Sequence, residues 1–253
     1  YNGNGVKELN EFETALYPDQ ATFVRVFIPT NEYIRVYSNQ FSQSVQLRPS
    51  VLWSSKKGIR KLLSYFSDQT VYRIDRKTTV DKNGSALNPF DGKTSDTAIV
   101  ALNSSFRTTL YFNQLGSKFG LEYGHQDVRG KTLLTNGLES RENIFEEGRL
   151  RWNITRPLNL NITGRVGKRG NGSAFFGNRN FRISYYEMEP KFSIQPGTDF
   201  RFSLIYRYAE KVNTAENGGQ FAVINKGGVE VKYNVLSKGS ILAQVDYINI
   251  KFN

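Results

Sequence analysis

The sequence predicts an all-β protein, built as an antiparallel up-and-down meander of about ten strands. Short turn signals recur at nearly constant spacing around Gly116, Pro157, Gly197 and Lys238. Between these turns every second residue is apolar, which is the period of a strand with one apolar and one polar face. A unit of roughly forty residues therefore repeats along the second half of the chain: a tight turn, a strand, a longer polar loop and another strand.

The alternation is clearest in three pairs of segments, each pair flanking one of the turns. In each segment, residues such as Leu, Val and Phe alternate with residues such as Arg, Lys and Asn. Two breaks, at Tyr185-Tyr186 and at Tyr247-Ile248, predict β-bulges, because one inserted residue reverses the facing of all that follow. The paired segments are 150–154 with 160–166, 192–194 with 200–208, and 229–235 with 241–247.

The first half of the chain predicts further strands and one helix. Alternation from Thr22 to Val36, broken at Pro29, predicts a small hairpin or edge strand. Strands are also expected near 41–53 and 69–78. Between them, the apolar residues of Lys56–Phe66 recur at helical spacing and are flanked by cations. This amphipathic helix either lies against a membrane surface or a partner, or is an insertion that caps one end of the strands.

Three features favour a transmembrane β-barrel over a soluble β-sandwich, which the alternation alone also fits. The strands span about ten to thirteen residues, whereas ~5–6 is usual in globular sheets and ~9–11 cross a bilayer. Connections alternate between short and long, as they do when the two ends of a barrel face the periplasm and the cell surface. The apolar face is also rich in aromatic residues near strand ends, where a lipid interface would hold them. These residues are Phe112, Phe119, Trp152, Phe192, Phe200, Tyr206, Tyr208 and Tyr233.

We therefore expect a region of outer-membrane β-barrel over residues 36–253, forming part of a larger barrel. Its apolar face would meet outer-membrane lipid and lipopolysaccharide, and its polar face would line the lumen. A small appendage over residues 1–35 would precede it. Long outer loops are expected near 80–97, 124–147, 167–181 and 209–228.

The start of the appendage has the spacing of a calcium-binding loop that lacks its opening Asp. In this register Asn2 and Asn4 take the third and fifth positions, Glu8 takes the ninth, and Glu11 is the closing bidentate carboxylate. Oxygen ligands at this spacing suit Ca²⁺. A short exiting helix is expected over 9–16. The alternative is a Gly/Asn turn that caps this helix without a metal ion.

Composition restricts the chemistry that the chain can perform. The chain has 253 residues, no cysteine and a formal net charge of +11. Without cysteine, a disulfide scaffold, a thiol nucleophile, a Cys-ligated zinc and an all-thiolate iron–sulfur site are excluded. Since the cations occupy alternate strand positions and loops, we expect a solvated or lumenal surface and no nucleic-acid partner. A basic lumen or rim would favour anionic solutes or the phosphates of lipopolysaccharide.

No catalytic centre is expected. Asp127 could orient the ring of His125, but no Ser nucleophile follows within two residues, so we interpret His125 as a loop histidine. Glu187 and Glu189 share a face, yet a lysine continues their row and neighbouring strands supply arginines, which predicts ion pairs rather than paired catalytic acids. The glycine-rich stretch 167–172 lacks the strand-to-helix context of a phosphate loop and is expected in an outer loop.

Several turn and strand motifs carry a family resemblance. They are Asn2-Gly3-Asn4-Gly5 with residues 8–13, Asn31-Glu32-Tyr33, and the segments 133–137, 151–158 and 230–234. Together they resemble the C-terminal region of large, mostly uncharacterised outer-membrane barrel proteins of Bacteroidota, over most of the chain. In such proteins the calcium-type loop begins with an Asp and the chain continues beyond the position of Phe252-Asn253. The resemblance therefore implies that this chain is part of a longer protein.

The resemblance bears on location and fold more than on activity. Large barrels of that phylum serve as import channels, as export pores of the type IX system, or as accessory subunits of outer-membrane assembly machinery. We expect a non-enzymatic outer-membrane protein that acts with other outer-membrane or periplasmic proteins in an envelope complex for protein export, insertion or scaffolding. The alternatives are a passive solute channel and a secreted β-sandwich that binds glycans through its aromatic face.

Overall fold

The structure is a computed structural model. It describes residue 5 and residues 11–24, 33–79, 96–135, 137–216, 218–235 and 238–253. The chain divides into two compact units, Tyr1–Ile34 and Arg35–Asn253. The predicted boundary between appendage and sheet, after residue 35, differs from this division by one residue.

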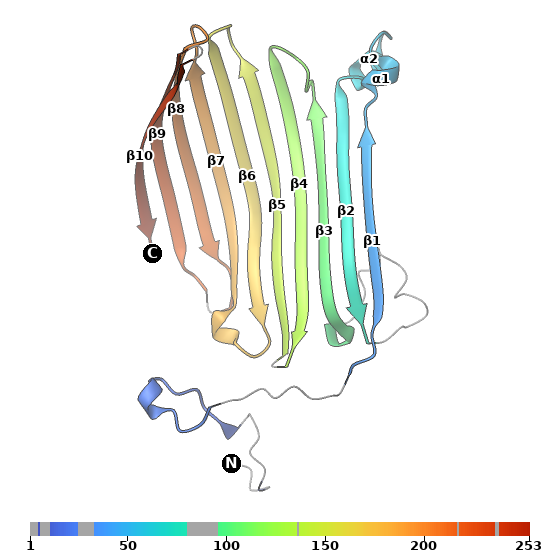
Figure 1. The fold of residues 1–253 in the computed structure, drawn as a ribbon, viewed down its shortest axis with the longest axis vertical. Helices are drawn as coiled ribbons and strands as arrows, with labels where there is room; N and C mark the ends of the chain where they lie inside the picture. Colours follow the sequence, from blue (N-terminus) through green and yellow to red (C-terminus); the bar gives the residue numbers. More distant parts are fainter. Residues whose placement is uncertain are drawn as a thin grey trace. The chain divides into compact units, whose positions relative to one another are not determined.

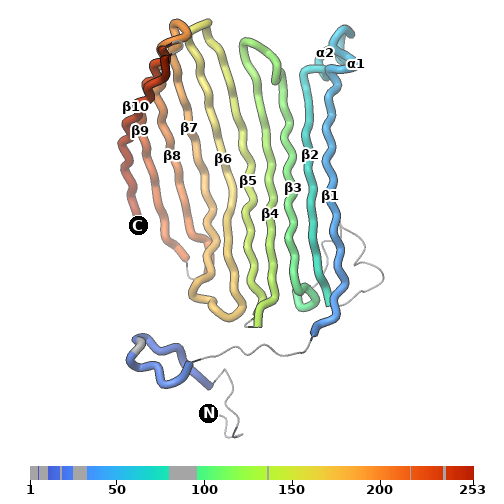
Figure 2. The backbone as a smooth tube through the Cα atoms, viewed as in Figure 1, coloured from blue at the N-terminus to red at the C-terminus, as the bar shows by residue number. Residues whose placement is uncertain are grey.

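The second unit is one antiparallel sheet of ten strands in a single layer (Figures 1 and 2). Each strand pairs with its sequence neighbours, so the sheet is an up-and-down meander, and within the described residues β1 and β10 are its free edges. The predicted fold class is confirmed: the unit is all-β, antiparallel and up-and-down, and its open sheet fits part of a barrel. The strands are β1 (Tyr37–Leu47), β2 (Phe66–Thr78), β3 (Ile99–Phe112), β4 (Phe119–Leu134), β5 (Gly137–Asn153), β6 (Leu158–Ser173), β7 (Phe181–Ile194), β8 (Phe200–Asn213), β9 (Phe221–Val235) and β10 (Gly239–Phe252).

The predicted alternation of short and long connections is only partly present: the connection from β1 to β2 spans residues 48–65, whereas β5 begins at Gly137, soon after β4 ends at Leu134. The four predicted turns join β3 to β4, β5 to β6, β7 to β8 and β9 to β10 at one end, which we call the short-turn end (top in Figure 1). The connection from β1 to β2 lies at this end too, and it holds α1 (Ser50–Trp53) and α2 (Ile59–Leu63). The remaining connections lie at the opposite end, which we call the long-loop end.

The predicted helical insertion is present but shorter than expected. α2 covers only the middle of Lys56–Phe66, because the chain enters β2 at Phe66. The strand expected near 41–53 ends at Leu47, since Pro49 cannot donate to a strand ladder, and α1 follows. Leu52 in α1 and Ile59 in α2 are 72% and 77% exposed. The two helices therefore leave apolar side chains uncovered at the short-turn end.

The predicted long loop at 124–147 is wrong. β4 continues to Leu134 and β5 begins at Gly137, so nearly all of this segment is paired strand. The glycine-rich stretch 167–172 likewise belongs to β6 rather than to an outer loop. Toward the long-loop end both faces of the sheet carry polar side chains, so the period-two signal fades although the backbone pairing continues.

The other predicted loops also change in extent. The loop expected at 167–181 is reduced to 174–180, and the one at 209–228 is reduced to 214–220. Of the loop expected at 80–97, residues 80–95 lie outside the described residues, and a 3₁₀ turn begins at Asp96. The strands of the second half are consequently longer than the alternation predicts.

Cross-strand register separates the side chains onto two faces. Residues that face each other across neighbouring strands form rows that run across the sheet. One such row crosses seven strands and contains only apolar residues, and we call the face that carries it the apolar face. All eight aromatic residues predicted for that face lie on it. Along each strand, the residues that alternate with those of the apolar face point to the opposite side of the sheet, which we call the polar face. The apolar row is Phe119, Trp152, Leu160, Phe192, Leu204, Val229 and Val245.

Mainly apolar side chains form a band on the apolar face next to the short-turn end. In three neighbouring strands the band covers Leu158–Val166, Tyr186–Ile194 and Phe200–Tyr208. Each segment is about nine residues long, which corresponds to ~27 Å along the strand. Toward the long-loop end the same face then becomes ionic. The first ionic residues beyond the band are Lys168, Arg182 and Glu210.

Neither predicted bulge is present. The β6–β7 register continues unshifted through Tyr185 and Tyr186, and the β9–β10 register continues unshifted through Tyr247 and Ile248. At Tyr186 the pattern breaks because the apolar band ends there. In β10 it breaks because Ile248 and Ile250 lie on the polar side of an edge strand.

The N-terminal unit contains a 3₁₀ turn over Pro18–Gln20. Phe12, Ala15 and Leu16 lie outside any helix, so the exiting helix is wrong over these residues. The middle of the predicted hairpin, 25–32, is outside the described residues, and the flanking residues 21–24 and 33–36 form no strand.

Candidate functional site on the polar face

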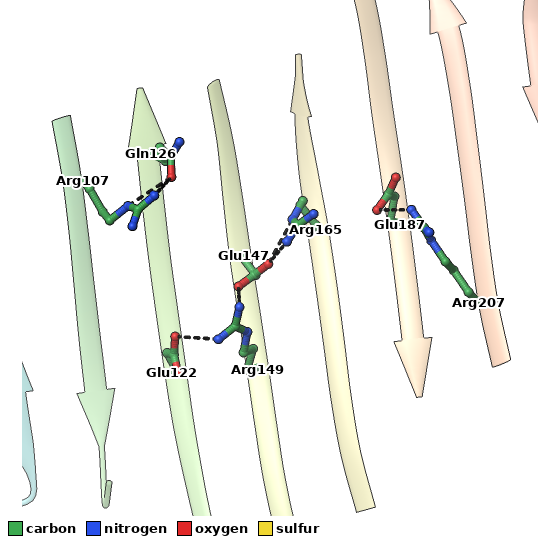
Figure 3. Close-up of polar contacts among 8 residues, drawn as sticks. All are labelled: Arg107, Glu122, Gln126, Glu147, Arg149, Arg165, Glu187 and Arg207. Atoms are coloured by element: carbon green, nitrogen blue, oxygen red, sulfur yellow. Dashed lines mark hydrogen bonds and ion pairs between the residues drawn. The ribbon is translucent and has the colours of Figure 1, made fainter. Parts of the chain in front are cut away.

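Glu147 is the centre of an ion-pair network on the polar face (Figure 3). Its carboxylate lies between two guanidinium groups: Nη2 of Arg149 is 2.5 Å from Oε1, and Nε of Arg165 donates to Oε2 at 2.9 Å. Arg149 also reaches Oε1 of Glu122 in β4 at 3.3 Å. The side chain of Glu147 is only 9% exposed. Its charge is therefore balanced mainly by protein groups rather than by water.

A second group of ion pairs continues the network across β7 and β8. Nη2 of Arg207 is 2.9 Å from Oε2 of Glu187 (Figure 3), and Nζ of Lys211 is 3.9 Å from Oε1. Lys191, in the same row of β7, pairs with Glu230 of β9 at 3.1 Å. Glu189 makes no ion pair with any described residue. The ion pairs predicted around Glu187 and Glu189 are therefore present for Glu187 alone among the described residues.

Register explains why these charges meet. Glu147 faces Arg165 across β5 and β6, and Arg165 faces Glu187 across β6 and β7. Charges of alternating sign therefore lie in one row, with neighbouring strands ~4.8 Å apart. Directly opposed opposite charges stabilise a strand pair by roughly 0.2–1 kcal/mol. The row gives this part of the sheet a hydrophilic surface held together by hydrogen bonds and ion pairs.

His125 lies within β4, not in a loop as expected. It is on the apolar face just beyond the apolar band, where it faces Thr108 and Glu146. Its Nδ1 is 3.9 Å from Oε1 of Glu146. Asp127, the predicted orienting residue, is instead held by Arg129, whose Nε and Nη2 donate to it at 2.8 and 2.7 Å. His125 and Asp127 therefore do not form a catalytic pair.

Asp68, Thr70 and Thr108 form a polar inset in the apolar face of β2 and β3. Oγ1 of Thr70 donates to Oδ2 of Asp68 at 2.9 Å, and Oγ1 of Thr108 donates to Oδ1 at 3.1 Å. The two hydroxyl oxygens are 2.8 Å apart. Two hydroxyl groups thus solvate a carboxylate whose cross-strand neighbours, Leu47 and Leu110, are apolar.

The predicted calcium site can be placed only in part. Asn2, Asn4 and Glu8 are outside the described residues, whereas Glu11 is described. Among the described residues, no group of three or more His, Cys, Asp or Glu side chains is placed to hold a metal ion. Calcium therefore stays a prediction from the sequence.

Sequence reasoning does not identify Glu147 as a site residue. It falls at the end of the loop expected at 124–147, where no facing was assigned. Its parity with Arg149 and Arg151 is the signal that would have placed it on the polar face. Asp68 is missed for a related reason, because its parity with Phe66 and Tyr72 places a charge where the pattern predicts an apolar residue.

Neither a protein-family model nor a curated protein matches this chain. The resemblance drawn from the sequence motifs accordingly stays a prediction. No helix among the described residues is long and apolar enough to cross a membrane.

Proposed function

We propose that the unit Arg35–Asn253 forms part of the wall of an outer-membrane β-barrel, with lipid on its apolar face and a hydrated lumen on its polar face. The observation that carries this proposal is an uncovered apolar face on a single-layer sheet. Trp152, Leu204 and Tyr233 are 46%, 46% and 48% exposed on that face. In water such a surface would drive association or aggregation, whereas acyl chains would cover it without a second protein layer.

The dimensions of the apolar band support the same proposal. Its nine-residue segments agree with the ~9–11 residues that a tilted strand needs to cross a bilayer. Tyr186 and Tyr208 lie at its ionic border, and Phe200 and Tyr233 lie near the short turns. Aromatic rings at both borders are typical of the interfacial girdles of membrane barrels. The alternative of a soluble sandwich requires a second layer over the apolar face, and the described residues of this unit contain none.

Within this proposal, a role in an envelope complex is favoured over an isolated solute channel by the polar inset. A carboxylate on the lipid side of a barrel is destabilising near the bilayer centre. Asp68 and its two threonines would be better accommodated against a partner protein than against acyl chains. The exposed apolar residues of α1 and α2, next to Lys56 and Lys57, offer a further contact at the short-turn end. These features support our proposal that the chain acts with a partner protein, in a complex for protein export, insertion or scaffolding.

Single cysteines in β8 test the proposal directly, since the native chain has none. Leu204→Cys and Tyr206→Cys lie on the apolar face, and Ile205→Cys and Arg207→Cys are their matched neighbours on the polar face. In lipid vesicles, a water-soluble maleimide should label the Ile205→Cys and Arg207→Cys variants quickly and leave the other two unlabelled until the protein is denatured. Equal labelling of all four variants would show that water reaches both faces and would overturn the proposal.

A further inference from the structure

The polar face is hollowed at the short-turn end. A cavity of about 1030 Å³ lies there, walled by the turns before β4, between β5 and β6, and between β7 and β8. We call it the cationic basin. Its lining includes five cations and not one carboxylate. The cations are Lys118, Arg151, Arg156, Lys191 and Arg201.

Groups of the protein itself neutralise only part of the positive charge of the basin. Arg151 donates to the carbonyl oxygens of Gln114 and Gly116, each at 3.0 Å, and Arg201 donates to Oε1 of Gln195 at 2.9 Å. Both arginines thus contact neutral acceptors and keep their full charge. Lys191 is the exception, since it pairs with Glu230 at 3.1 Å.

Lys118 and Arg156 are the two most available cations of the basin. Both are exposed, and their side chains make no hydrogen bond or ion pair with any described residue. The contrast with the middle of the sheet is clear, because there Arg149, Arg165 and Arg207 each contact a glutamate. Positive charge without a protein counter-charge, in a concave site with low-dielectric walls, raises the local concentration of anions.

Polar neutral groups complete the walls. Nδ2 of Asn159 donates to Oδ1 of Asn153, and Nδ2 of Asn161 donates to Oδ1 of Asn159, so three amides form a ladder across the basin. Thr155 and Ser193 also line it, and the hydroxyl group of Ser193 is hydrogen-bonded to that of Ser203 at 3.0 Å. Amides and hydroxyls can pair with the backbone of a bound chain as well as with carboxylates.

The width of the basin favours an extended anion over a compact one as its ligand. The cations extend from Lys118, at the start of β4, to Arg201 in β8. Four inter-strand spacings of ~4.8 Å give a span of ~19 Å. An extended polypeptide covers that distance with about six residues at ~3.3 Å each. A single phosphate group can contact cations at only one place along this span.

We infer that the cationic basin binds an extended acidic polypeptide segment, whose carboxylates pair with Lys118 and Arg156 and with the outer sides of Arg151 and Arg201. Charge-assisted hydrogen bonds from lysine and arginine to carboxylates are the strong contacts of such recognition. The inference concerns the polar face alone and holds whichever medium meets the apolar face. Its failure and that of the proposed membrane location are therefore distinguishable.

A binding measurement with the whole chain in detergent tests the inference. The probe is a fluorescein-labelled decapeptide in which Glu alternates with Ser, compared with the same peptide carrying Gln for Glu. We expect fluorescence anisotropy to show binding of the acidic peptide, and at least tenfold weaker binding of the neutral one. The double variant Lys118→Gln/Arg156→Gln should lose at least tenfold in affinity for the acidic peptide.

The matched control removes the same charge at the other end of the sheet. Lys168→Gln/Arg169→Gln should bind the acidic peptide within twofold of the unmodified protein. Similar losses in both double variants would reveal a non-specific charge effect, and inorganic phosphate displacing the peptide at equal concentration would reveal a compact anion site; either result overturns the inference. The charge reversal Lys118→Glu/Arg156→Glu should weaken binding of the acidic peptide further than the double Gln variant does. A far-UV circular dichroism spectrum unchanged from that of the unmodified protein separates lost recognition from lost folding.

Discussion

Glu147 is the residue of the polar face whose neutralisation should matter most. Its side chain is 9% exposed and it contacts both Arg149 and Arg165. Glu147→Gln would leave these guanidinium groups facing each other without an intervening charge. Removing one partner of a largely buried, charged hydrogen bond costs about 1–3 kcal/mol. We predict a loss of this size in the free energy of unfolding, measured by urea titration of the protein in lipid vesicles.

Glu146→Gln is the matched control, because it makes the same change one residue away on the opposite face. The side chain of Glu146 is 52% exposed, and its Oε1 is 3.9 Å from Nδ1 of His125. We expect a change below about 0.5 kcal/mol, as for most surface substitutions. Equal effects of the two substitutions would mean that the network around Glu147 contributes nothing of its own.

β6 carries an apolar and a polar side chain at neighbouring positions, which allows the proposed facing to be tested. Ile162 lies at the middle of its apolar segment, and Thr163 is the next residue on the polar face between Arg149 and Glu189. An arginine on the lipid side near the bilayer midplane costs about 2–4 kcal/mol, falling toward the interfaces. We predict a loss of this size for Ile162→Arg in vesicles and less than half of it for Thr163→Arg, by the same urea titration. A larger loss for Thr163→Arg would contradict this assignment of the faces.

The part of the fold that could be predicted from the sequence is the part in which the two faces differ. Around Trp152, Leu160 and Phe200 the alternation is strict, and the predicted turns and facing are confirmed there. Toward the long-loop end, Lys168 and Arg169 are adjacent cations on opposite faces of one strand. Such sequences lack the period-two alternation of apolar and polar residues. The sequence therefore predicts a loop where the ends of β4 and β5 are paired.

The residues of the candidate site likewise divide into those whose facing could be predicted from the sequence and those whose facing could not. The facing of Glu187 and Arg207 could be predicted because both lie in or near alternating segments. Glu147 could not, because its strand was hidden in the predicted loop. The cationic basin depends on register among three hairpin ends, which no single segment specifies. Its lack of carboxylates is a property of the assembled sheet, and only cross-strand pairing reveals it.

The sheet as a unit has two free edges, β1 and β10, each with a single paired neighbour among the described strands. In the hydrocarbon region of a bilayer, unpaired backbone N–H and C=O groups cost several kcal/mol each. A barrel built with this wall would therefore have to pair both edges, either with each other or with further strands. The exposed Val245 and Tyr247 of β10 would then continue the apolar face onto a neighbouring strand.

The fluorescence of Trp152 reports on the medium at the apolar face. Trp53 is the other tryptophan of the chain, so Trp53→Phe leaves Trp152 alone. The matched control moves the indole one residue to the polar face, by Arg151→Trp in a Trp53→Phe/Trp152→Phe background. We predict that vesicle lipids brominated in their acyl chains quench Trp152 strongly, whereas aqueous iodide quenches the control. Quenching of Trp152 by iodide, without an effect of the brominated lipid, would contradict a lipid-facing wall.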